Sequence, residues 1–282
     1  MGDADPLNGN DPYEKIGGDR MDSLAALRSQ KKDLIKEYRS RMRTARQDDD
    51  NEKFKRCANA IEEIEAAVER IERGPLRKVV LAQALTVDLE RDLSMPAAFA
   101  RLSETYPDCF RFLFAPTDGG RFFGATPERL VSREGRVVTT EALAGSTGRG
   151  DTPAEDEWLA RELQASEKDS HEHELVVEAI KDQLTPFATT ISTGDRTVRK
   201  LATVQHLQTP VTADLAEDDH VLELVEALHP TPAVGGLPPD EALETITETE
   251  AFERGWYASP VGWFDAAGNG TFAVAIRSAV AT

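Results

Sequence analysis

The sequence VGWFDAAGNGTFAVAIRSAV, residues 261–280, consists of two apolar runs joined by a turn. The joining segment AAGNG (266–270) contains Asn-Gly, a dipeptide that strongly favours a tight turn between antiparallel strands. In the second run, TFAVAIRSAV (271–280), residues alternate as they do in a strand with one buried face. The stretch therefore predicts a β-hairpin whose second strand runs through Arg277.

Similar short runs of aromatic and β-branched residues recur from Lys78 onward, and REGR (133–136) predicts a second hairpin turn. Helical patterns at 154–185 and 240–254 separate the groups of strands. Many antiparallel strands with helices inserted between them indicate an α+β domain rather than regular βαβ winding. The further predicted strands are KVVLAQALTVDL (78–89), FRFLFA (110–115), RFFGA (121–125), RLVSR (129–133) and RVVTTEAL (136–143).

The N-terminal part has a different composition. Residues 1–20 are polar and rich in Gly and Asp, so we expect them to be disordered or loosely attached. Residues 21–46 are charged and favour a helix, and a second amphipathic pattern ends at Gly74 and Pro75. We expect residues 1–50 to form a poorly ordered or helical acidic segment and residues 51–282 to form the main domain.

The charge balance is strongly acidic. The 282 residues include 51 Asp and Glu against 33 Lys and Arg, a net charge of -18, which disfavours binding to nucleic acid and to anionic membranes. An acidic surface is also typical of proteins from a halophilic host. Cys57 and Cys109 lack the spacing of a metal site or a disulfide framework, so we expect two free thiols in the cytoplasm. No apolar stretch is long enough to span a membrane.

Glu172 lies in ASEKDSHEHELVVEA (165–179), at the head of an apolar stripe. If a helix begins near Ser166, Glu172, Val176, Ile180 and Leu184 follow one another along one side. A carboxylate facing a dry interior needs a cation, and Mg²⁺ commonly takes one or two protein carboxylates. His171 and His173 point in nearly opposite directions and cannot share one ion. The alternative is a solvated acidic first turn favoured by the helix dipole.

Two cations are predicted to lie on strand faces of small residues. Lys78 shares its face with Val80, Ala82 and Ala84, and a lysine lining an apolar cavity has a lowered pKa suited to a general base. Arg277 suits the bidentate binding of a carboxylate. A lysine reaching for water and a surface ion pair are the alternatives.

Two further segments have the residues of a site. Glu128 in GATPERL follows Gly and Pro and begins a strand, so its position is well fixed, as that of a catalytic acid must be. Gly145, Gly148 and Gly150 are able to present backbone N–H groups to an anion, although most glycine-rich turns are only turns.

Seven blocks together resemble the chorismate-utilising enzymes, which include isochorismate, salicylate, anthranilate and aminodeoxychorismate synthases. The resemblance implies a fold of two stacked, mostly antiparallel sheets flanked by helices. The blocks are KVVLAQAL (78–85), GATPERL (124–130), EALAGSTGRG (141–150), SEKDSHEHELVVEAI (166–180), VQHLQTP (204–210), LHPTPAVGGLP (228–238) and ERGWYASPVGWFDAAGNGTFAVAIRSA (253–279).

The resemblance implies a role for each matching residue. Lys78 resembles the lysine that activates the attacking water at ring carbon 2 of chorismate, and Glu128 resembles the acid that protonates the departing hydroxyl at carbon 4. Glu172 resembles a ligand of the Mg²⁺ cofactor. The positions that resemble the lining of the substrate site are Gly145, Ser146, Ala233 and Arg277.

The implied reaction is the conversion of chorismate to isochorismate for menaquinone or siderophore synthesis. Amine-forming relatives carry a lysine where this chain has Ala144, and salicylate synthases share the same residues but also eliminate pyruvate. Relatives have over a hundred residues before the lysine strand and continue into a second metal-binding motif after the IRSA block. A salicylate synthase, a truncated non-catalytic remnant and a chorismate-binding subunit therefore remain alternatives.

Overall fold

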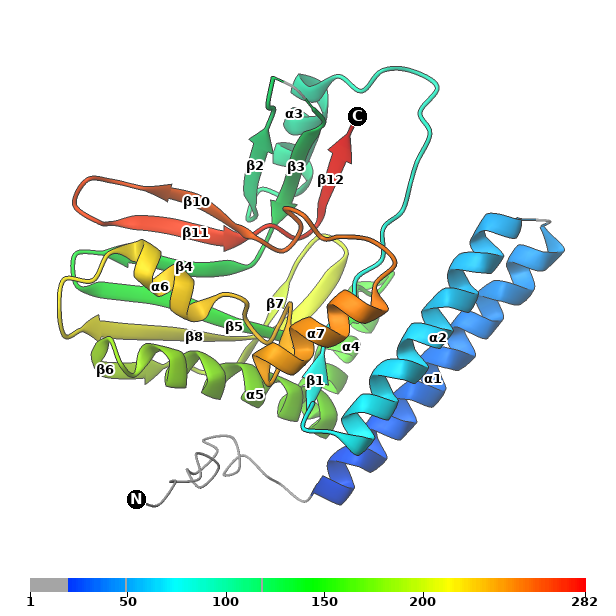
Figure 1. Ribbon diagram of the computed structural model, residues 1–282, viewed down its shortest axis with the longest axis horizontal. Helices are drawn as coiled ribbons and strands as arrows, with labels where there is room; N and C mark the ends of the chain where they lie inside the picture. Colours follow the sequence, from blue (N-terminus) through cyan, green and yellow to red (C-terminus); the bar gives the residue numbers. More distant parts are fainter. Residues whose placement is uncertain (1–19, 49, 118) are drawn as a thin grey trace, which may run out of the picture. The chain divides into compact units, whose positions relative to one another are not determined.

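The computed structural model describes residues 20–48, 50–117 and 119–282 (Figure 1). The chain divides into two compact units, residues 1–75 and residues 76–282. The disorder expected for residues 1–20 falls, up to residue 19, outside the described residues.

The first unit contains two helices, α1 (Arg20–Gln47) and α2 (Asn51–Arg73), that pack together as a hairpin. The helix predicted over 21–46 is confirmed. Asp50 caps α2, because its side chain accepts a hydrogen bond of 2.9 Å from the Lys53 amide. Small and apolar side chains are buried in this unit: Ile35, Ala45, Cys57, Ala60, Ala67 and Val68.

The second unit is built on a seven-stranded antiparallel sheet. Both predicted hairpins are confirmed, at 133–136 between β4 and β5 and at 266–270 between β10 and β11. The α+β class is confirmed as well. The order across the sheet is β10 (Pro260–Phe264), β11 (Gly270–Val274), β4 (Arg129–Glu134), β5 (Val137–Gly148), β8 (Val204–Leu215) and β6 (Ala188–Thr193), and β7 (Thr197–Lys200) also pairs with β8.

A three-stranded sheet lies beside the large one, and the prediction of one continuous strand over TFAVAIRSAV is wrong. The chain leaves the large sheet after Val274 and enters the small sheet at Ser278 (Figure 1). A tight turn separates the strands, since the Ile276 amide bonds to the Val274 carbonyl at 2.8 Å and Arg277 has a left-handed φ of 52°. The small sheet contains β12 (Ser278–Ala281), β3 (Arg121–Thr126) and β2 (Phe110–Phe114).

The strand predicted over KVVLAQALTVDL is also mostly wrong. Only β1 (Lys78–Val79) is a strand, and it pairs with β9 (Gly236–Leu237). No described strand lies beside residues 81–89, so their backbone forms no strand hydrogen bonds. The two strand faces predicted from the alternation of these residues therefore do not form. Three of their apolar side chains are exposed, Leu85, Val87 and Leu89, at 70, 72 and 57 %.

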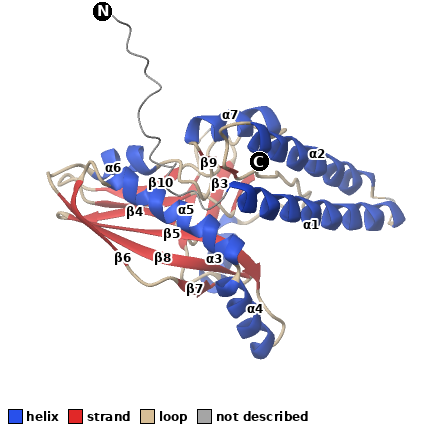
Figure 2. Ribbon diagram, turned by 90° about the horizontal axis from the view of Figure 1, so that it is seen from below, coloured by secondary structure: helices blue, strands red, loops and turns tan. Residues whose placement is uncertain are grey.

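The helices of the second unit are α3 (Met95–Thr105), α4 (Pro153–Ala165), α5 (Glu167–Leu184), α6 (Val221–Leu228) and α7 (Pro239–Thr249). The helical region predicted at 154–185 forms two helices. Helix α4 ends at Ala165, and Ser166 then caps the N-terminus of α5. Helices α5 and α6 lie across one face of the large sheet (Figure 2). None of the described helices is long and apolar enough to cross a membrane.

The core lies between the large sheet and these two helices. The predicted stripe on α5 is confirmed, since Val176, Ile180 and Leu184 are almost completely buried. Each such side chain contributes roughly 2 kcal/mol of hydrophobic stabilisation. Cys57 and Cys109 are buried free thiols.

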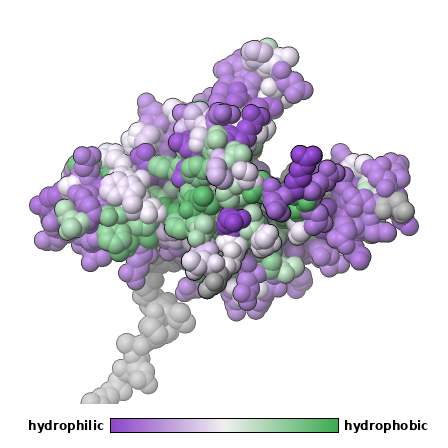
Figure 3. All heavy atoms as spheres, turned by 90° about the horizontal axis from the view of Figure 1, so that it is seen from above, coloured by the Kyte–Doolittle hydropathy of each residue, from purple (hydrophilic) through white to green (hydrophobic). Residues whose placement is uncertain are grey.

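Apolar residues also gather on the face seen from above in Figure 3. Phe112 and Phe122 are buried on the small sheet with their ring centroids 5.2 Å apart. Trp256 continues this cluster to the surface, since its ring lies 5.9 Å from that of Phe122 and 6.1 Å from that of Phe114. One face of the small sheet therefore carries an aromatic cluster that is buried at Phe112 and Phe122 and exposed at Trp256.

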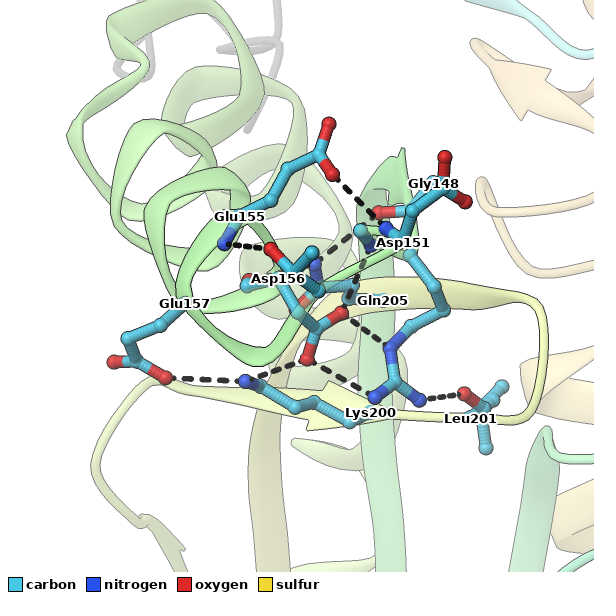
Figure 4. Close-up of polar contacts among 11 residues, drawn as sticks. Gly148, Asp151, Glu155, Asp156, Glu157, Lys200, Leu201 and Gln205 are labelled. Carbon is cyan, nitrogen blue, oxygen red and sulfur yellow. Dashed lines mark hydrogen bonds and ion pairs between the residues drawn. The ribbon is translucent and has the colours of Figure 1, made fainter.

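A polar network attaches α4 to the end of the large sheet (Figure 4). Asp156 accepts hydrogen bonds from Arg149 Nη2 and from Lys200 Nζ, both at 3.0 Å. Arg149 also donates to the Leu201 carbonyl, and Gln205 Nε2 donates to the carbonyls of Gly148 and Asp156. The hydrogen bonds from Arg149 and then from Lys200 hold the pKa of the Asp156 carboxyl well below its usual range.

We predict that Asp156→Asn lowers the urea midpoint of unfolding at neutral pH, because two cations lose their carboxylate. A carboxyl with a depressed pKa stabilises the fold above its unfolded pKa of about 4 and loses this effect as the pH falls. The difference between variant and parent should therefore shrink towards about pH 3. Glu157→Gln is the control, since Glu157 is 61 % exposed. An equal loss in both variants would contradict the prediction.

Candidate active site

Lys78 lies in the two-residue strand β1. It is half-buried, and its Nζ donates a hydrogen bond of 2.8 Å to the carbonyl of Pro232. Burial lowers the pKa of the Lys78 amine, and the carboxylates of Glu172 and Glu128 partly offset this effect. The three side chains therefore lie close enough to interact electrostatically.

Glu128 lies where the chain crosses from β3 in the small sheet to β4 in the large sheet. Its residue is only 5 % exposed, and Thr231 Oγ1 lies 3.4 Å from its Oε1. Burial raises the pKa of the Glu128 carboxyl to about 7, against the opposing effects of Lys78 and Thr231. A carboxyl of this kind still holds its proton near neutral pH and is able to donate it.

Arg277 lies at the second crossing between the two sheets, from β11 to β12. The crossings are bonded to each other, because the Val274 amide donates to the Glu128 carbonyl at 3.0 Å and the Ala125 amide donates to the Arg277 carbonyl at 3.3 Å. Arg277 also lowers the pKa of Glu128. The junction of the sheets thus brings a buried acid and an exposed guanidinium together.

Arg277 Nη2 lies 2.7 Å from Nε2 of His206, and Nδ1 of the same ring lies 2.7 Å from Ser146 Oγ. A guanidinium only donates hydrogen bonds, so Nε2 accepts and the proton of the neutral ring is on Nδ1. Burial, and then the Arg277 cation, lower the pKa of His206 to about 4. His206 is therefore neutral near pH 7 and orients Arg277, whose other N–H groups remain available to an anion.

Glu172 is a half-buried residue near the start of α5, at the head of the buried stripe. The described residues contain no group of three or more His, Cys, Asp or Glu side chains arranged to hold a metal ion. The chemistry of the position suits Mg²⁺ bound through one protein carboxylate, with substrate and water as the other ligands.

His173 is 1 % exposed, so its ring lies inside the protein and not on the surface of α5. Its Nδ1 lies 3.1 Å from the Ala144 carbonyl, and its Nε2 lies 2.7 Å from Thr209 Oγ1. The ring therefore fixes α5 to β5 and β8, and this contact sets the position of Glu172.

Gly145 and Ala233 border the same region. Gly145 has a φ of 77° at a break in the β5–β8 register, and a side chain there would have its Cβ only 3.2 Å from that of Asp169. Glycine is therefore required at this irregularity of strand β5. Ala233 follows Pro232, the residue that accepts the bond from Lys78, and it packs against the core.

The electrostatic and hydrogen-bonded contacts connect five residues into one group, which we call the acid–base cluster: Lys78, Glu128, Glu172, His206 and Arg277. His206, Thr231 and the Pro232 carbonyl were not predicted as site groups from the sequence. All three lie inside the quoted blocks VQHLQTP and LHPTPAVGGLP, which therefore contained the signal.

A comparison with known protein families matches residues 11–282 to the family described as chorismate binding enzyme. The chain belongs to the chorismate-binding enzyme family. The match covers the second unit and with it every residue of the acid–base cluster. The resemblance inferred from the seven blocks is thereby confirmed.

Among the relatives of the chain is the salicylate biosynthesis isochorismate synthase of Pseudomonas aeruginosa. It is 45 % identical over 218 residues, which make up 77 % of this chain and 45 % of the relative. Isochorismate synthase MenF of Bacillus subtilis is 38 % identical over 76 % of this chain and 46 % of its own length. The chain thus spans about half the length of these curated relatives.

A solved structure supports the same fold. The menaquinone-specific isochorismate synthase MenF of Escherichia coli matches with a TM-score of 0.72 and 31 % identity. The match covers 80 % of this chain and 52 % of that chain. The expected chorismate-binding fold is confirmed.

We predict that Glu128→Gln is more stable than the parent at alkaline pH. A carboxyl whose folded pKa is raised, here to about 7, stabilises the folded state less as the pH rises through that value. At about 1.4 kcal/mol per pKa unit, a rise from 4.5 to about 7 makes the gain well above pH 7 a few kcal/mol, and the gain vanishes near pH 4. Urea unfolding at the two pH values measures it, with exposed Glu134→Gln as the control. A gain that is independent of pH would contradict the prediction.

Proposed function

We propose that the chain catalyses the Mg²⁺-dependent conversion of chorismate to isochorismate. The observation that carries the proposal is the electrostatic interaction of Lys78 with Glu128, an amine whose pKa burial lowers and a carboxyl whose pKa burial raises. The family membership and the names of the relatives support the choice of substrate. Isochorismate synthases are isomerases, so the overall reaction needs no redox cofactor.

Each residue has one part in the proposed reaction. Lys78, in its neutral form, accepts a proton from the water whose oxygen bonds to ring carbon 2. The ring double bonds shift, and the bond from carbon 4 to its hydroxyl breaks. Glu128 donates its proton to that hydroxyl, which leaves as water. One water enters and one leaves, so the reaction is balanced.

The remaining residues of the cluster bind the substrate. Arg277 offers its free N–H groups to a carboxylate of chorismate, in the orientation that His206 sets. Gly145, Ser146 and Ala233 line the site. Glu172 would hold the Mg²⁺ ion, which would neutralise the ring carboxylate when bound. Menaquinone or siderophore synthesis would use the product.

Two alternatives use the same residues. A salicylate synthase would form isochorismate and then eliminate pyruvate. A chorismate-binding subunit or remnant would bind the substrate without converting it. The products separate the three, because isochorismate is resolved from chorismate by chromatography, pyruvate is detected with lactate dehydrogenase, and calorimetry detects binding without turnover.

We predict that Lys78→Ala and Glu128→Gln each reduce isochorismate formation by ~10² to 10⁴-fold, the usual contribution of a general base or acid. Purified protein is incubated with chorismate and Mg²⁺ and the products are quantified by chromatography. Lys181→Ala is the matched control, since Lys181 is a lysine on α5 that pairs with Glu178. If both site variants turned over like the parent, the assigned roles would be wrong.

We also predict that the rate falls as the pH rises above about 7. The acid must be protonated, and the Glu128 pKa of about 7 means that its protonated fraction declines above that value. The plot of kcat/KM against pH should therefore have an alkaline limb beginning near pH 7. A rate that stays level to pH 9 would rule out Glu128 as the proton donor.

A further inference from the structure

The segment that carries Lys78 is held by very few strand contacts. Strand β1 has two residues, and the ladder ends when the Val80 amide donates to the Gly235 carbonyl at 2.8 Å. Two backbone groups that follow bond to side chains instead. The Val80 carbonyl accepts from Arg254 Nη2 at 2.7 Å, and the Ala82 amide donates to Glu250 Oε1 at 2.8 Å.

Glu250 and Arg254 are also bonded to each other, with Arg254 Nε 2.9 Å from Glu250 Oε2. Their side chains are 1 % and 17 % exposed, respectively. A buried ion pair is weak evidence for stability, since the loss of hydration offsets much of the attraction. The bonds that this pair makes to the backbone suggest another role.

Arg254 also bonds to the loop whose Pro232 carbonyl accepts the hydrogen bond from Lys78. Its Nη1 donates to the Val234 carbonyl at 2.8 Å, two residues after Pro232, whose carbonyl accepts the bond from Lys78 Nζ. The guanidinium thus links two backbone segments. One is the segment after Lys78, at the Val80 carbonyl, and the other is the loop that contains Pro232 and Val234. The rigid fork of an arginine can hold two such carbonyls, whereas a single ammonium group cannot hold both in this geometry.

Helix α7 fixes the location of the pair. Glu250 is the C-cap residue of α7, directly after Thr249, and the buried Ala242 and Ile246 pack the helix against the rest of the second unit. The helix and the short ladder are in close contact at Gly236, where an added Cβ would lie 2.1 Å from the Lys78 carbonyl oxygen and 2.7 Å from Ala242 Cβ. Backbone, helix and ion pair therefore form one rigid support.

We propose that Glu250 and Arg254 are positioning residues that hold the Lys78 strand and its receiving loop in register, so that the amine faces Glu128 and Glu172. The hydrogen bonds of the pair to the Val80 carbonyl and the Ala82 amide take the place of further strand hydrogen bonds, which this two-residue strand lacks. Its effect on catalysis rests on the proposed function, but its effect on the exposure of Lys78 does not.

The first experiment measures the accessibility of Lys78 in the full chain. Parent and Arg254→Lys are acetylated with acetic anhydride at one alkaline pH, and mass spectrometry gives the rate at Lys78 relative to Lys181 in the same molecule. Arg254→Lys keeps the charge but loses the fork, so we expect the relative rate to rise at least ~10-fold. Glu250→Gln keeps an acceptor for the Ala82 amide, so we expect a smaller rise.

Arg149→Lys is the matched control. Arg149 is likewise a partly buried arginine that bonds to an acid, Asp156, and to a backbone carbonyl, that of Leu201, but it contacts no part of the Lys78 segment. We expect this variant to lose stability and to leave the acetylation rate of Lys78 unchanged. Equal rises in Arg149→Lys and Arg254→Lys would overturn the proposal, as would no rise in Arg254→Lys.

A charge reversal, Glu250→Arg with Arg254→Glu, separates positioning from simple pairing. It restores an ion pair but turns donors towards the Ala82 amide and acceptors towards the carbonyls of Val80 and Val234. We expect no recovery of Lys78 protection, and recovery to the parent rate would overturn the proposal. If the reversed protein does not fold, the single substitutions decide.

Kinetics give the catalytic readout. In Arg254→Lys we expect kcat to fall ~100-fold with KM changed little, because a misplaced base affects the chemical step more than binding. A variant with exposed Lys78 and the parent's kcat would overturn the positioning role. A parent that forms no isochorismate would instead refute the proposed function, while the acetylation result would still decide whether the pair holds Lys78.

Discussion

The proposed chemistry depends on an amine and a carboxyl group that interact with each other while burial keeps water away from them. Burial favours the neutral form of both groups, so it lowers the pKa of Lys78 and raises that of Glu128 to about 7. The charged forms of the two groups attract each other, and this attraction partly offsets the effect of burial on both pKa values. Burial therefore makes the Lys78 amine easier to deprotonate and the Glu128 carboxyl harder to deprotonate than the same groups in water. In water neither group would have these properties.

The two sheets explain how the chain brings these groups together. It crosses between the sheets twice, once at Glu128 and once at Arg277, and backbone hydrogen bonds join the crossings. The left-handed φ of 52° at Arg277 costs of order 1 kcal/mol, which the surrounding hydrogen bonds and packing must offset. Lys78 enters from a third place, the short β1–β9 ladder. A site assembled from three separate segments requires a rigid frame, and the packing of α5 and α6 on the large sheet supplies it.

Local patterns predicted much of this arrangement. The turns at 133–136 and 266–270 and the stripe on α5 are set by nearby residues, and the structure confirms them. The runs at 78–89 and 271–280 were predicted as single strands because alternation cannot reveal where a partner strand is absent or where a chain changes sheets. Likewise, His206 and the Glu250–Arg254 pair act through contacts distant in sequence. Their importance follows from tertiary structure, although the sequence blocks that contain His206 and Arg254 resemble family motifs.

The most direct test is the electrostatic coupling between the two central groups. Nuclear magnetic resonance of the protein with isotope-labelled lysine side chains would give the pKa of Lys78 in the parent and in Glu128→Gln. The account predicts a lower pKa for Lys78 in the variant, because the opposing carboxylate is gone while burial remains. An unchanged pKa would show that the two groups do not share one region, and it would contradict the central claim.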